Sequence, residues 1–291
     1  SGRRPANLAM CIREQSGGHT KIIFIGKPSS MPEDYELIIY SAEHQFPVLP
    51  NLQPITLPLM RVDEAQVAAA ADEWQTRFAD LPRPLTAFLV GGPTGPFLFN
   101  AKAARRLQAT IRQVIAETGG TAYITTSRRT PPAVVEALQS DLPAAARLFT
   151  WSADASDNPY RALLGLADGF VVTGDSISMM VEVVRLRKPL AILGLPVGAV
   201  GSVDLLRRSL TRWLFDPRSH GPLDRLRQAA GRALYRLRIL THTRDFVAFH
   251  NMLVARGLAV HAGEPLRAPV GEVPDDLAIA VQRIVALTGD T

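Results

Sequence analysis

The sequence predicts an α/β protein whose sheets are mostly parallel. Between residues 86 and 193, short apolar runs of strand length alternate with longer segments that have a helical hydrophobic period. Strands that alternate with helices need crossover connections, which give a parallel sheet covered by helices on both faces. The chain has 291 residues, of which 47% are hydrophobic, so it is long enough for two packed domains.

The first part of the chain, residues 1–80, is expected to form the smaller domain. Apolar runs at residues 21–25 and 37–40 predict two buried strands, because Gly, Pro, Ser and Asp bound them on both sides. Residues 46–58 contain four prolines and no helical period, so they are expected to be a loop or an edge strand.

The boundary between the domains is expected in the proline-rich residues 80–84. It follows a helix for which Asp63 is a predicted N-cap and which continues to Phe78. Residues 81–240 are then expected to form the second, larger domain. Residues 241–291 are expected to form C-terminal helices that pack back on the first domain.

The second domain alternates regularly between strands and helices. Strands are predicted at residues 86–90, 121–125, 148–151, 169–173 and 189–193, and helices at residues 101–118, 133–139, 159–167 and 175–186. Ligands of parallel sheets bind at the carboxyl ends of the strands. The loops that follow the strands are therefore the expected position of a site.

The first of these loops is rich in glycine. Gly91, Gly92 and Gly95 surround Pro93 and Thr94, directly after a strand. Glycines at such a position let backbone N–H groups approach a phosphate, and the helix that follows adds a positive potential. The pattern is neither a P-loop nor G-x-G-x-x-G, so a plain tight turn explains it equally well.

The second loop, residues 125–131 (TTSRRTP), combines hydroxyl groups with two adjacent arginines. Hydroxyls and guanidinium groups, such as those of Ser127, Arg128 and Arg129, are suitable donors for a diphosphate. A helix start with Thr130 as N-cap and Pro131 at the first helical position is a compatible alternative. It explains Thr130 and leaves the two arginines without a role.

The third loop contains Asp175 and Ser176, either of which can cap the following helix. Glu182 lies six or seven residues further on, nearly two helical turns, and is expected on the same general face. A carboxylate there can accept the hydroxyl groups of a ribose. The alternative is an ordinary solvated helix glutamate.

Four strings give the sequence a specific resemblance. GGPTG, TTSRRTPP, the stretch that contains GDSISM, and FHNMLVARG resemble the bacterial relatives of the plant elongated-mitochondria (mitochondrial fission) protein family. The resemblance extends over roughly residues 1–257. Its most specific parts are the strings at residues 127–131 and 174–179.

The resemblance implies a GT-B-like fold, in which two Rossmann-like domains each have a parallel sheet and the second domain holds a nucleotide sugar. Family members are regarded as glycosyltransferases. The substrate implied is a nucleoside-diphosphate sugar of UDP or GDP type, with no further cofactor, no metal and an unknown acceptor. The donor-site residues carried over or suggested by their loops are Gly91, Gly92, Thr94, Ser127, Arg128, Arg129, Asp175, Ser176 and Glu182. Arg128 would face the diphosphate and Glu182 the ribose.

Two further implications concern activity. The plant members act as adaptors that recruit a dynamin-like protein to mitochondria, so a non-catalytic adaptor remains an alternative. Members usually carry an additional N-terminal segment with a His-containing loop, so a shortened first domain without an assigned catalytic base is expected. His19, beside Gly17 and Gly18, is the acid/base candidate that the sequence offers.

Residues 201–245 look like an arginine-rich insert within the second domain. Leucines at helical spacing alternate with arginines there, which is typical of a basic amphipathic helix that lies on an anionic membrane surface. Trp213 and Phe215 would add interfacial anchors, so residues 205–238 are the expected contact. The alternative is a helix that packs on the sheet, or a dimer contact, with solvated arginines.

Composition excludes several classes of protein. The net charge is +5, and 28 of the 32 basic residues are arginines, which suits a phosphate-bearing ligand but is also typical of GC-rich genomes. Acidic residues are mixed with the basic ones and no nucleic-acid-binding motif is present, so no nucleic acid partner is expected. A single cysteine, Cys11, excludes a disulfide scaffold, and no signal peptide or spanning segment is recognised. A cytoplasmic, peripherally membrane-associated protein is expected.

Overall fold

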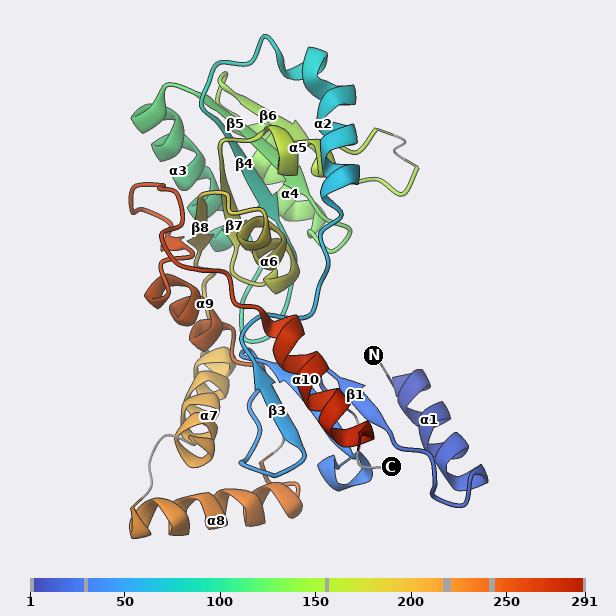
Figure 1. Cartoon of the computed structure of the whole chain (residues 1–291). Helices are drawn as coiled ribbons and strands as arrows, with labels where there is room; N and C mark the ends of the chain where they lie inside the picture. Colours follow the sequence, from blue (N-terminus) through green and yellow to red (C-terminus); the bar gives the residue numbers. More distant parts are fainter. Residues whose placement is uncertain (1–2, 29–30, 155–156, 217–220, 241–243, 290–291) are drawn as a thin grey trace. The chain divides into compact units, whose positions relative to one another are not determined.

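The computed structural model describes residues 3–28, 31–154, 157–216, 221–240 and 244–289 (Figure 1). The chain divides into two compact units. Unit 1 comprises Ser1–Leu59, Asp204–Phe249 and Pro274–Thr291, and unit 2 comprises Met60–Val203 and His250–Val273. Each unit has its own parallel sheet, which confirms the predicted α/β class.

The sheet of unit 2 has the strand order of a dinucleotide-binding fold. Its strands are β4 (Leu85–Val90), β5 (Thr121–Thr126), β6 (Ala146–Phe149), β7 (Gly169–Thr173), β8 (Leu190–Leu193) and β9 (Val260–His261). They pair in parallel in the order β6-β5-β4-β7-β8-β9, which is 3-2-1-4-5-6 when counted from β4. That is the Rossmann order, and it reverses between β4 and β7.

Helices cover both faces of this sheet (Figure 1). They are α2 (Glu64–Phe78), α3 (Ala101–Thr118), α4 (Pro132–Ser140), α5 (Tyr160–Leu166) and α6 (Ile177–Arg185). Ile124 of β5 packs in one core with residues of α3 and α4, whereas the neighbouring Tyr123 stacks on Phe78 of α2 at 5.1 Å between ring centroids. Successive strand residues thus face opposite layers. All six residues of β4 are buried, as its central position requires.

The boundary between the units lies before α2, so the prediction that it falls in residues 80–84 is wrong. Helix α2 packs closely against α5 of unit 2. At Gly165 of α5, a Cβ atom would lie 2.8 Å from the Cβ of Ala71, so the two helices are in direct contact. The sequence shows the proline-rich joint but not which sheet a preceding helix covers.

The sheet of unit 1 is small and parallel, in the order β1-β2-β3. Its elements are α1 (Arg3–Gln15), β1 (Ile23–Ile25), the short 3₁₀ helix η1 (Pro32–Asp34), β2 (Leu37–Ser41), β3 (Leu52–Ile55) and α10 (Asp276–Thr288). One core joins Ala6 of α1 to Ile38, and another joins Ala280 of α10 to Ile39 and Ile55. Strand β3 contains Pro54, which an edge strand tolerates because one side of its backbone is unpaired.

The two helices of the arginine-rich insert also belong to unit 1, apart from the first turn of α7. They are α7 (Ala199–Phe215) and α8 (Pro222–Arg236), and Phe215, Tyr235 and Leu240 form a core with Phe46. The expected placement of this insert within a second domain of residues 81–240 is therefore wrong. Local sequence patterns show that these helices are amphipathic, but their packing partner lies more than 150 residues away in the chain.

The last part of the chain contributes to both units. Helix α9 (Phe246–Ala255) passes from one to the other, and β9 extends the sheet of unit 2 beside β8. Residues 241–291 therefore do not form one C-terminal segment, as the sequence suggested. The start of this stretch, up to Phe249, and Pro274–Thr291, which contains α10, group with the first sheet, whereas His250–Val273 groups with the second.

Many local predictions agree with the structure. The Asp63 carboxylate accepts a hydrogen bond from the Gln66 amide and caps α2 as expected, and α3 has the predicted bounds. At the other end of α3, Gly119 adopts a left-handed conformation with a φ of 67°. Within the described ranges, no helix is both long enough and apolar enough to cross a bilayer.

Candidate functional site

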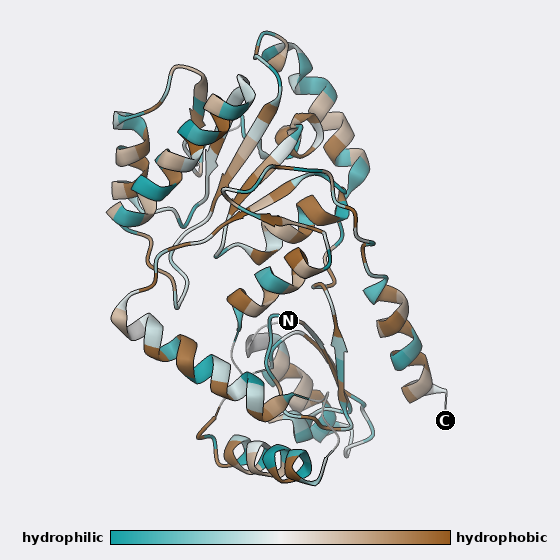
Figure 2. Cartoon of the chain, turned by 90° about the vertical axis from the view of Figure 1, so that its left-hand side faces the viewer, coloured by the Kyte–Doolittle hydropathy of each residue, from teal (hydrophilic) through white to brown (hydrophobic). Residues whose placement is uncertain are grey.

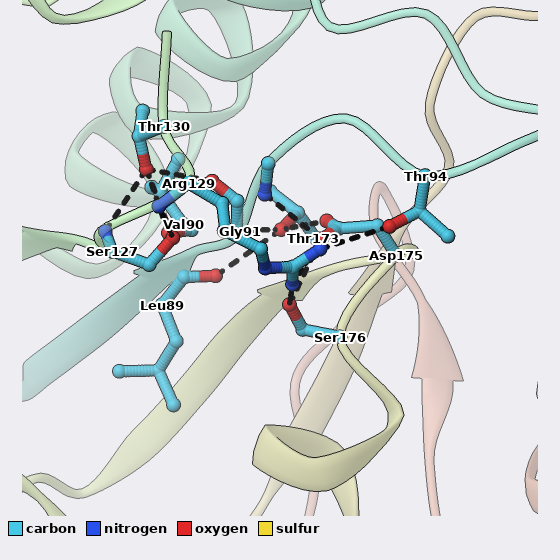
Figure 3. Close-up of polar contacts among 11 residues, drawn as sticks. Leu89, Val90, Gly91, Thr94, Ser127, Arg129, Thr130, Thr173, Asp175 and Ser176 are labelled. Carbon is cyan, nitrogen blue, oxygen red and sulfur yellow. Dashed lines mark hydrogen bonds and ion pairs between the residues drawn. The ribbon is translucent and has the colours of Figure 1, made fainter. Parts of the chain in front are cut away.

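Three loops of unit 2 meet where the strand order reverses (Figure 3). They follow β4, β5 and β7, and they are the three loops in which the sequence predicted a site. The carboxyl ends of adjacent parallel strands lie at one edge of a sheet, and the reversal leaves a crevice between helices that diverge to opposite faces. The predicted residues Gly91, Thr94, Ser127, Arg129, Asp175 and Ser176 come together there.

Asp175 joins the three loops. Its side chain is fully buried, and its Oδ2 atom accepts hydrogen bonds from the Gly92 amide at 2.9 Å and from the Ser176 hydroxyl at 3.0 Å. The Thr173 hydroxyl donates to Oδ1 at 2.7 Å, and the Arg129 guanidinium lies 3.2 Å from Oδ2. These donors and this positive charge compensate for the lost hydration of a buried carboxylate.

The two glycines after β4 are required by the packing of the loops against each other. A Cβ atom at Gly91 would lie 2.1 Å from Asp175 Oδ2, and one at Gly92 would lie 2.2 Å from the Arg129 carbonyl oxygen. The Gly91 amide donates to the Thr173 hydroxyl at 2.9 Å. Both glycine amides thus have internal partners, in place of the phosphate contacts expected from the sequence.

Thr130 connects the second loop to the first. Its hydroxyl accepts from the Ser127 amide at 2.9 Å and lies 2.6 Å from the Gly91 carbonyl oxygen, to which it donates. Helix α4 begins at Pro132, one residue after the start that a Thr130 cap implies, and its N-cap is Pro131. The prediction that Thr130 caps this helix is therefore wrong: its hydroxyl serves loop-to-loop packing instead.

The two adjacent arginines have different environments. Arg129 donates to the Thr94 hydroxyl at 2.9 Å and pairs with Asp175, and 46% of its side chain remains exposed. Arg128 is exposed, and it forms no hydrogen bond or ion pair with the residues that the structure describes. Arg129 thus stabilises the loops and still presents an edge to solvent, whereas Arg128 is available to a ligand.

The amino terminus of α6 lies at the same point. Ser176 is the N-cap residue, but its hydroxyl donates to Asp175 and does not cap the helix. The first-turn amides of a helix carry a partial positive charge that attracts anions. Ser178 is exposed in this turn and adds a hydroxyl that the sequence-based set of site residues did not include.

Glu182 is not an ordinary solvated glutamate, which was the alternative to a ribose-binding role. It is half-buried in α6 and accepts a hydrogen bond from the hydroxyl of Tyr160 in α5. Burial raises the pKa of Glu182, although the Tyr160 hydrogen bond opposes that rise. Burial and the adjacent Glu182 also raise the pKa of Tyr160 well above its usual range. No spacing rule in the sequence connects these two residues.

His19 lies at the opposite end of the small sheet from where a ligand is expected. It is exposed and precedes β1, whereas ligands bind beyond the carboxyl ends of parallel strands. The structure brings a different pair to that end. Glu43 and His44 lie shortly after the end of β2, are both buried, and are 3.5 Å apart between Oε1 and Nε2. Their position after the strand at residues 37–40 was the available signal.

The described residues contain no group of three or more His, Cys, Asp or Glu side chains that could hold a metal ion. The loops that follow β4, β5 and β7 offer cationic and hydrogen-bonding groups. Arg128, the exposed edge of Arg129, Ser178 and the amides of α6 are the groups that could meet an anion.

Similarity to known proteins extends over most of the chain. Residues 1–237 match the family model described as "Mitochondrial fission ELM1". "Mitochondrial fission protein ELM1" of Arabidopsis thaliana is 28% identical over 66% of this chain and 50% of its own length. The chain thus spans about half the length of that relative.

Two solved structures with partial similarity are a heptosyltransferase and a glycosyltransferase. "E. coli ADP-heptose lps heptosyltransferase II" is 15% identical, covers 65% of this chain and 66% of its own, and has a TM-score of 0.38. "Glycosyltransferase from Rickettsia africae ESF-5" is 9% identical, covers 87% of this chain and 80% of its own, and has a TM-score of 0.37.

Proposed function

We propose that this chain, which belongs to the mitochondrial fission ELM1 family, is a glycosyltransferase that binds a nucleoside-diphosphate sugar in unit 2. One observation carries the proposal. An exposed arginine, a partly exposed arginine and the amino terminus of a helix gather at the carboxyl ends of β4, β5 and β7, where the strand order of a nucleotide-binding sheet reverses. A diphosphate is the ligand that these groups suit best.

The chemistry of transfer follows from the same groups. When the bond between the sugar and the diphosphate breaks, negative charge develops on the leaving diphosphate. Arg128 and the exposed edge of Arg129 can stabilise that charge, together with the α6 amides and the Ser178 hydroxyl. Asp175 stays out of contact with the ligand and keeps Arg129 in place, because its own oxygens are all engaged.

Glu182 supplies the proposed contact to the ribose. The Tyr160 hydroxyl donates to Oε2 only, so the other oxygen of the carboxylate keeps its capacity to accept from a ribose hydroxyl. The hydrogen bond to Tyr160 also fixes the orientation of the carboxylate. Tyr160 is therefore a positioning residue in this account.

Calorimetry with UDP, GDP and their sugars tests this proposal. We expect wild type to bind one of the two nucleotides, and Arg128→Ala to bind it at least about tenfold more weakly, because a hydrogen bond to a charged group is lost. Arg105→Ala removes another exposed arginine, on α3, and serves as the matched control, with unchanged binding. Wild type that binds neither nucleotide nor their sugars would contradict the proposal.

The alternative is an adaptor that retains the fold without catalysis. It is favoured by the internal hydrogen bonds of the Gly91 and Gly92 amides, because the loop cluster is held together without any ligand. Nucleotide binding without release or transfer of the sugar, measured by product analysis over a panel of donors, would support this alternative. Transfer to any hydroxylated acceptor would exclude it.

Peripheral association with an anionic membrane is proposed for α7 and α8. Along α8, Leu223 and Leu226 are 80% and 69% exposed, and Leu237 directly after it is 69% exposed. Figure 2 shows apolar and polar positions interleaved along this helix. The helix packs through Leu234 and Tyr235 into a core with Phe46, against which residues of β2 and β3 also pack, so the alternative of a helix packed on the sheet holds for this side of α8. The three leucines lie outside that core.

Charge and a second apolar stripe support the same partner. The arginines Arg225, Arg236 and Arg238 are exposed beside the leucines. On α7, Leu206, Leu210 and Trp213 are exposed at helical spacing. Exposed apolar residues flanked by arginines are typical of helices that lie in an anionic lipid interface.

Flotation with liposomes tests this association. We expect binding to phosphatidylcholine vesicles that contain phosphatidylglycerol, weaker binding to phosphatidylcholine alone, and loss of binding in the double variant Leu223→Ser, Leu226→Ser. Leu277→Ser changes a similarly exposed leucine on α10 and is the matched control. A wild type that stays with the lipid-free fractions would overturn this proposal. Dimers that the double variant dissociates would assign the stripe to a contact between copies.

A further inference from the structure

Unit 1 has a cavity of about 660 Å³ at the carboxyl ends of its three strands. Residues that end or follow each strand line it, among them Ile25, Ser41 and Ile55. Gly26 turns the chain away from β1 with a φ of 103°, a conformation that glycine adopts without strain. The cavity thus occupies the edge at which parallel sheets bind ligands.

Glu43 is the buried acidic group of this cavity. Its side chain is only 6% exposed, and burial raises its pKa. Its Oε2 atom is buried and accepts no hydrogen bond from the residues that the structure describes. Buried carboxylate oxygens normally have donors, so an oxygen without one at a cavity wall indicates a ligand that supplies it.

The backbone fixes this acidic group in place. The Asp245 amide donates to the Glu43 carbonyl oxygen at 2.6 Å, and His44 and Arg244 form an antiparallel bridge. The Asp245 carboxylate in turn pairs with Arg212 at 2.7 Å and accepts from the Gln45 amide group at 2.8 Å. Two segments that are 200 residues apart therefore hold the Glu43–His44 pair rigidly.

Two cationic side chains line the same cavity. Lys27 follows β1, Arg244 lies beside His44, and both are exposed. A lysine and an arginine that face one cavity favour an anion, and the carboxylate at its wall favours a hydroxyl donor. The two preferences together describe one small molecule that carries both groups.

We propose that this cavity binds a small hydroxylated anion, of the class of sugar or polyol phosphates. Lys27 and Arg244 bind its phosphate, and Glu43 accepts a hydrogen bond from one of its hydroxyls, with His44 holding the carboxylate. The site involves residues of unit 1 alone, so it does not depend on the nucleotide site proposed in unit 2. Its ligand also differs from the nucleotide proposed for unit 2, because the ligand of this cavity has no base.

Calorimetry with glycerol phosphate, inorganic phosphate and glycerol tests this site. We expect glycerol phosphate to bind at least about tenfold more tightly than either of its parts, because each part lacks one set of contacts. All titrations are made in the Arg128→Ala background, in which phosphate binding in unit 2 is weakened, and the Lys27 and Arg244 variants then assign the binding that remains to unit 1. Nucleotide binding is measured separately on wild type. If the protein binds a nucleotide but not glycerol phosphate, or glycerol phosphate but not a nucleotide, only one of the two proposals fails.

Three variants assign the contacts. Lys27→Ala and Arg244→Ala are each expected to weaken the binding of glycerol phosphate and of inorganic phosphate about tenfold. Glu43→Gln is expected to retain inorganic phosphate and to lose the preference for glycerol phosphate over it. Lys102→Ala removes an exposed lysine from α3 and should bind as the parent does. Circular dichroism checks that each variant is folded.

Two results would overturn the inference. One is a folded parent protein that binds neither glycerol phosphate nor inorganic phosphate. The other is a folded Glu43→Gln protein with an unchanged preference for glycerol phosphate, since the buried carboxylate would then make no contact with the hydroxyl.

Discussion

The guanidinium of Arg129 lies 3.2 Å from the fully buried carboxylate of Asp175, and this pair joins the loops that follow β5 and β7. The Gly92 amide donates a hydrogen bond to the same carboxylate oxygen, which connects the loop that follows β4 to the other two. One acidic side chain thus connects all three loops at the point where the strand order reverses. Arg128, the residue that precedes Arg129, is left exposed to meet a ligand.

Asp175→Asn should destabilise the protein by about 2 kcal/mol, because it removes a buried charge that several donors surround. The partly exposed Arg129 limits the loss, since solvent screens its charge. Urea unfolding measures the change. Asp157→Asn, which breaks an exposed pair with Arg77, is the control and should cost less than about 1 kcal/mol. Equal losses in the two variants would show that Asp175 does not organise the loops.

Gly91→Ala should destabilise the protein by about 1–3 kcal/mol, since its Cβ would lie 2.1 Å from Asp175 Oδ2. Thermal unfolding measures the stability of this variant and of its control. Gly194→Ala is the matched control because the nearest atom to its Cβ would be 3.9 Å away, at the end of the Arg106 side chain. A Gly91→Ala protein as stable as this control would mean that the loops are not closely packed.

Tyr160→Phe should raise the pKa of Glu182 further, because the hydrogen bond that lowers it is removed while burial remains. An NMR titration of the Glu182 carboxyl measures the pKa directly. A lower pKa in the variant would contradict the observed pairing.

The same raised pKa predicts how stability depends on pH. A carboxyl group with a higher pKa in the folded state stabilises that state most at low pH, and the contribution is lost as the pH rises through the folded-state pKa. Wild type should therefore lose stability relative to Glu182→Gln as the pH rises from below the ordinary value of 4.5. Urea unfolding over this range measures the difference, and a gain with rising pH would contradict it.

Asp276→Ala should destabilise unit 1 by about 2 kcal/mol. The Asp276 carboxylate accepts from the amides of Thr56 at 2.6 Å and Leu57 at 2.7 Å, and the latter donor is buried, so its hydrogen bond is not replaced by water. Asp63→Ala removes an exposed helix cap and should cost about 1 kcal/mol. The two variants are compared by denaturant unfolding. A smaller loss for Asp276→Ala than for Asp63→Ala would be inconsistent with this contact.

The elements of unit 2 could be predicted because each apolar run is flanked by clear turn residues and followed by a helical period. The helix that Asp63 caps and the helix at residues 101–118 are examples. The unit to which a helix belongs could not be predicted in the same way. Helix α2 and helix α8 are each amphipathic, but the partner of their apolar side chains depends on distant residues such as Gly165 and Phe46.

For the site, too, the sequence predicts the loops but not the contacts of individual residues. The three loops could be predicted, because strand ends gather at one edge of a parallel sheet. Arg128 and Arg129 have the same chemistry and adjacent positions, so only the loop geometry distinguishes the exposed residue from the paired one. Tyr160 and Glu43 could not be assigned, because the first acts through a contact between helices and the second through burial.

The central claim is that a nucleoside diphosphate binds beside Arg128, and chemical protection of arginines tests it most directly. Phenylglyoxal modifies exposed arginines, and mass spectrometry of peptides locates each modification. With saturating UDP or GDP, we predict that Arg128 becomes protected while Arg105, which is also exposed and lies on α3, reacts as before. Arg128 that reacts at the same rate with and without bound nucleotide would contradict the account.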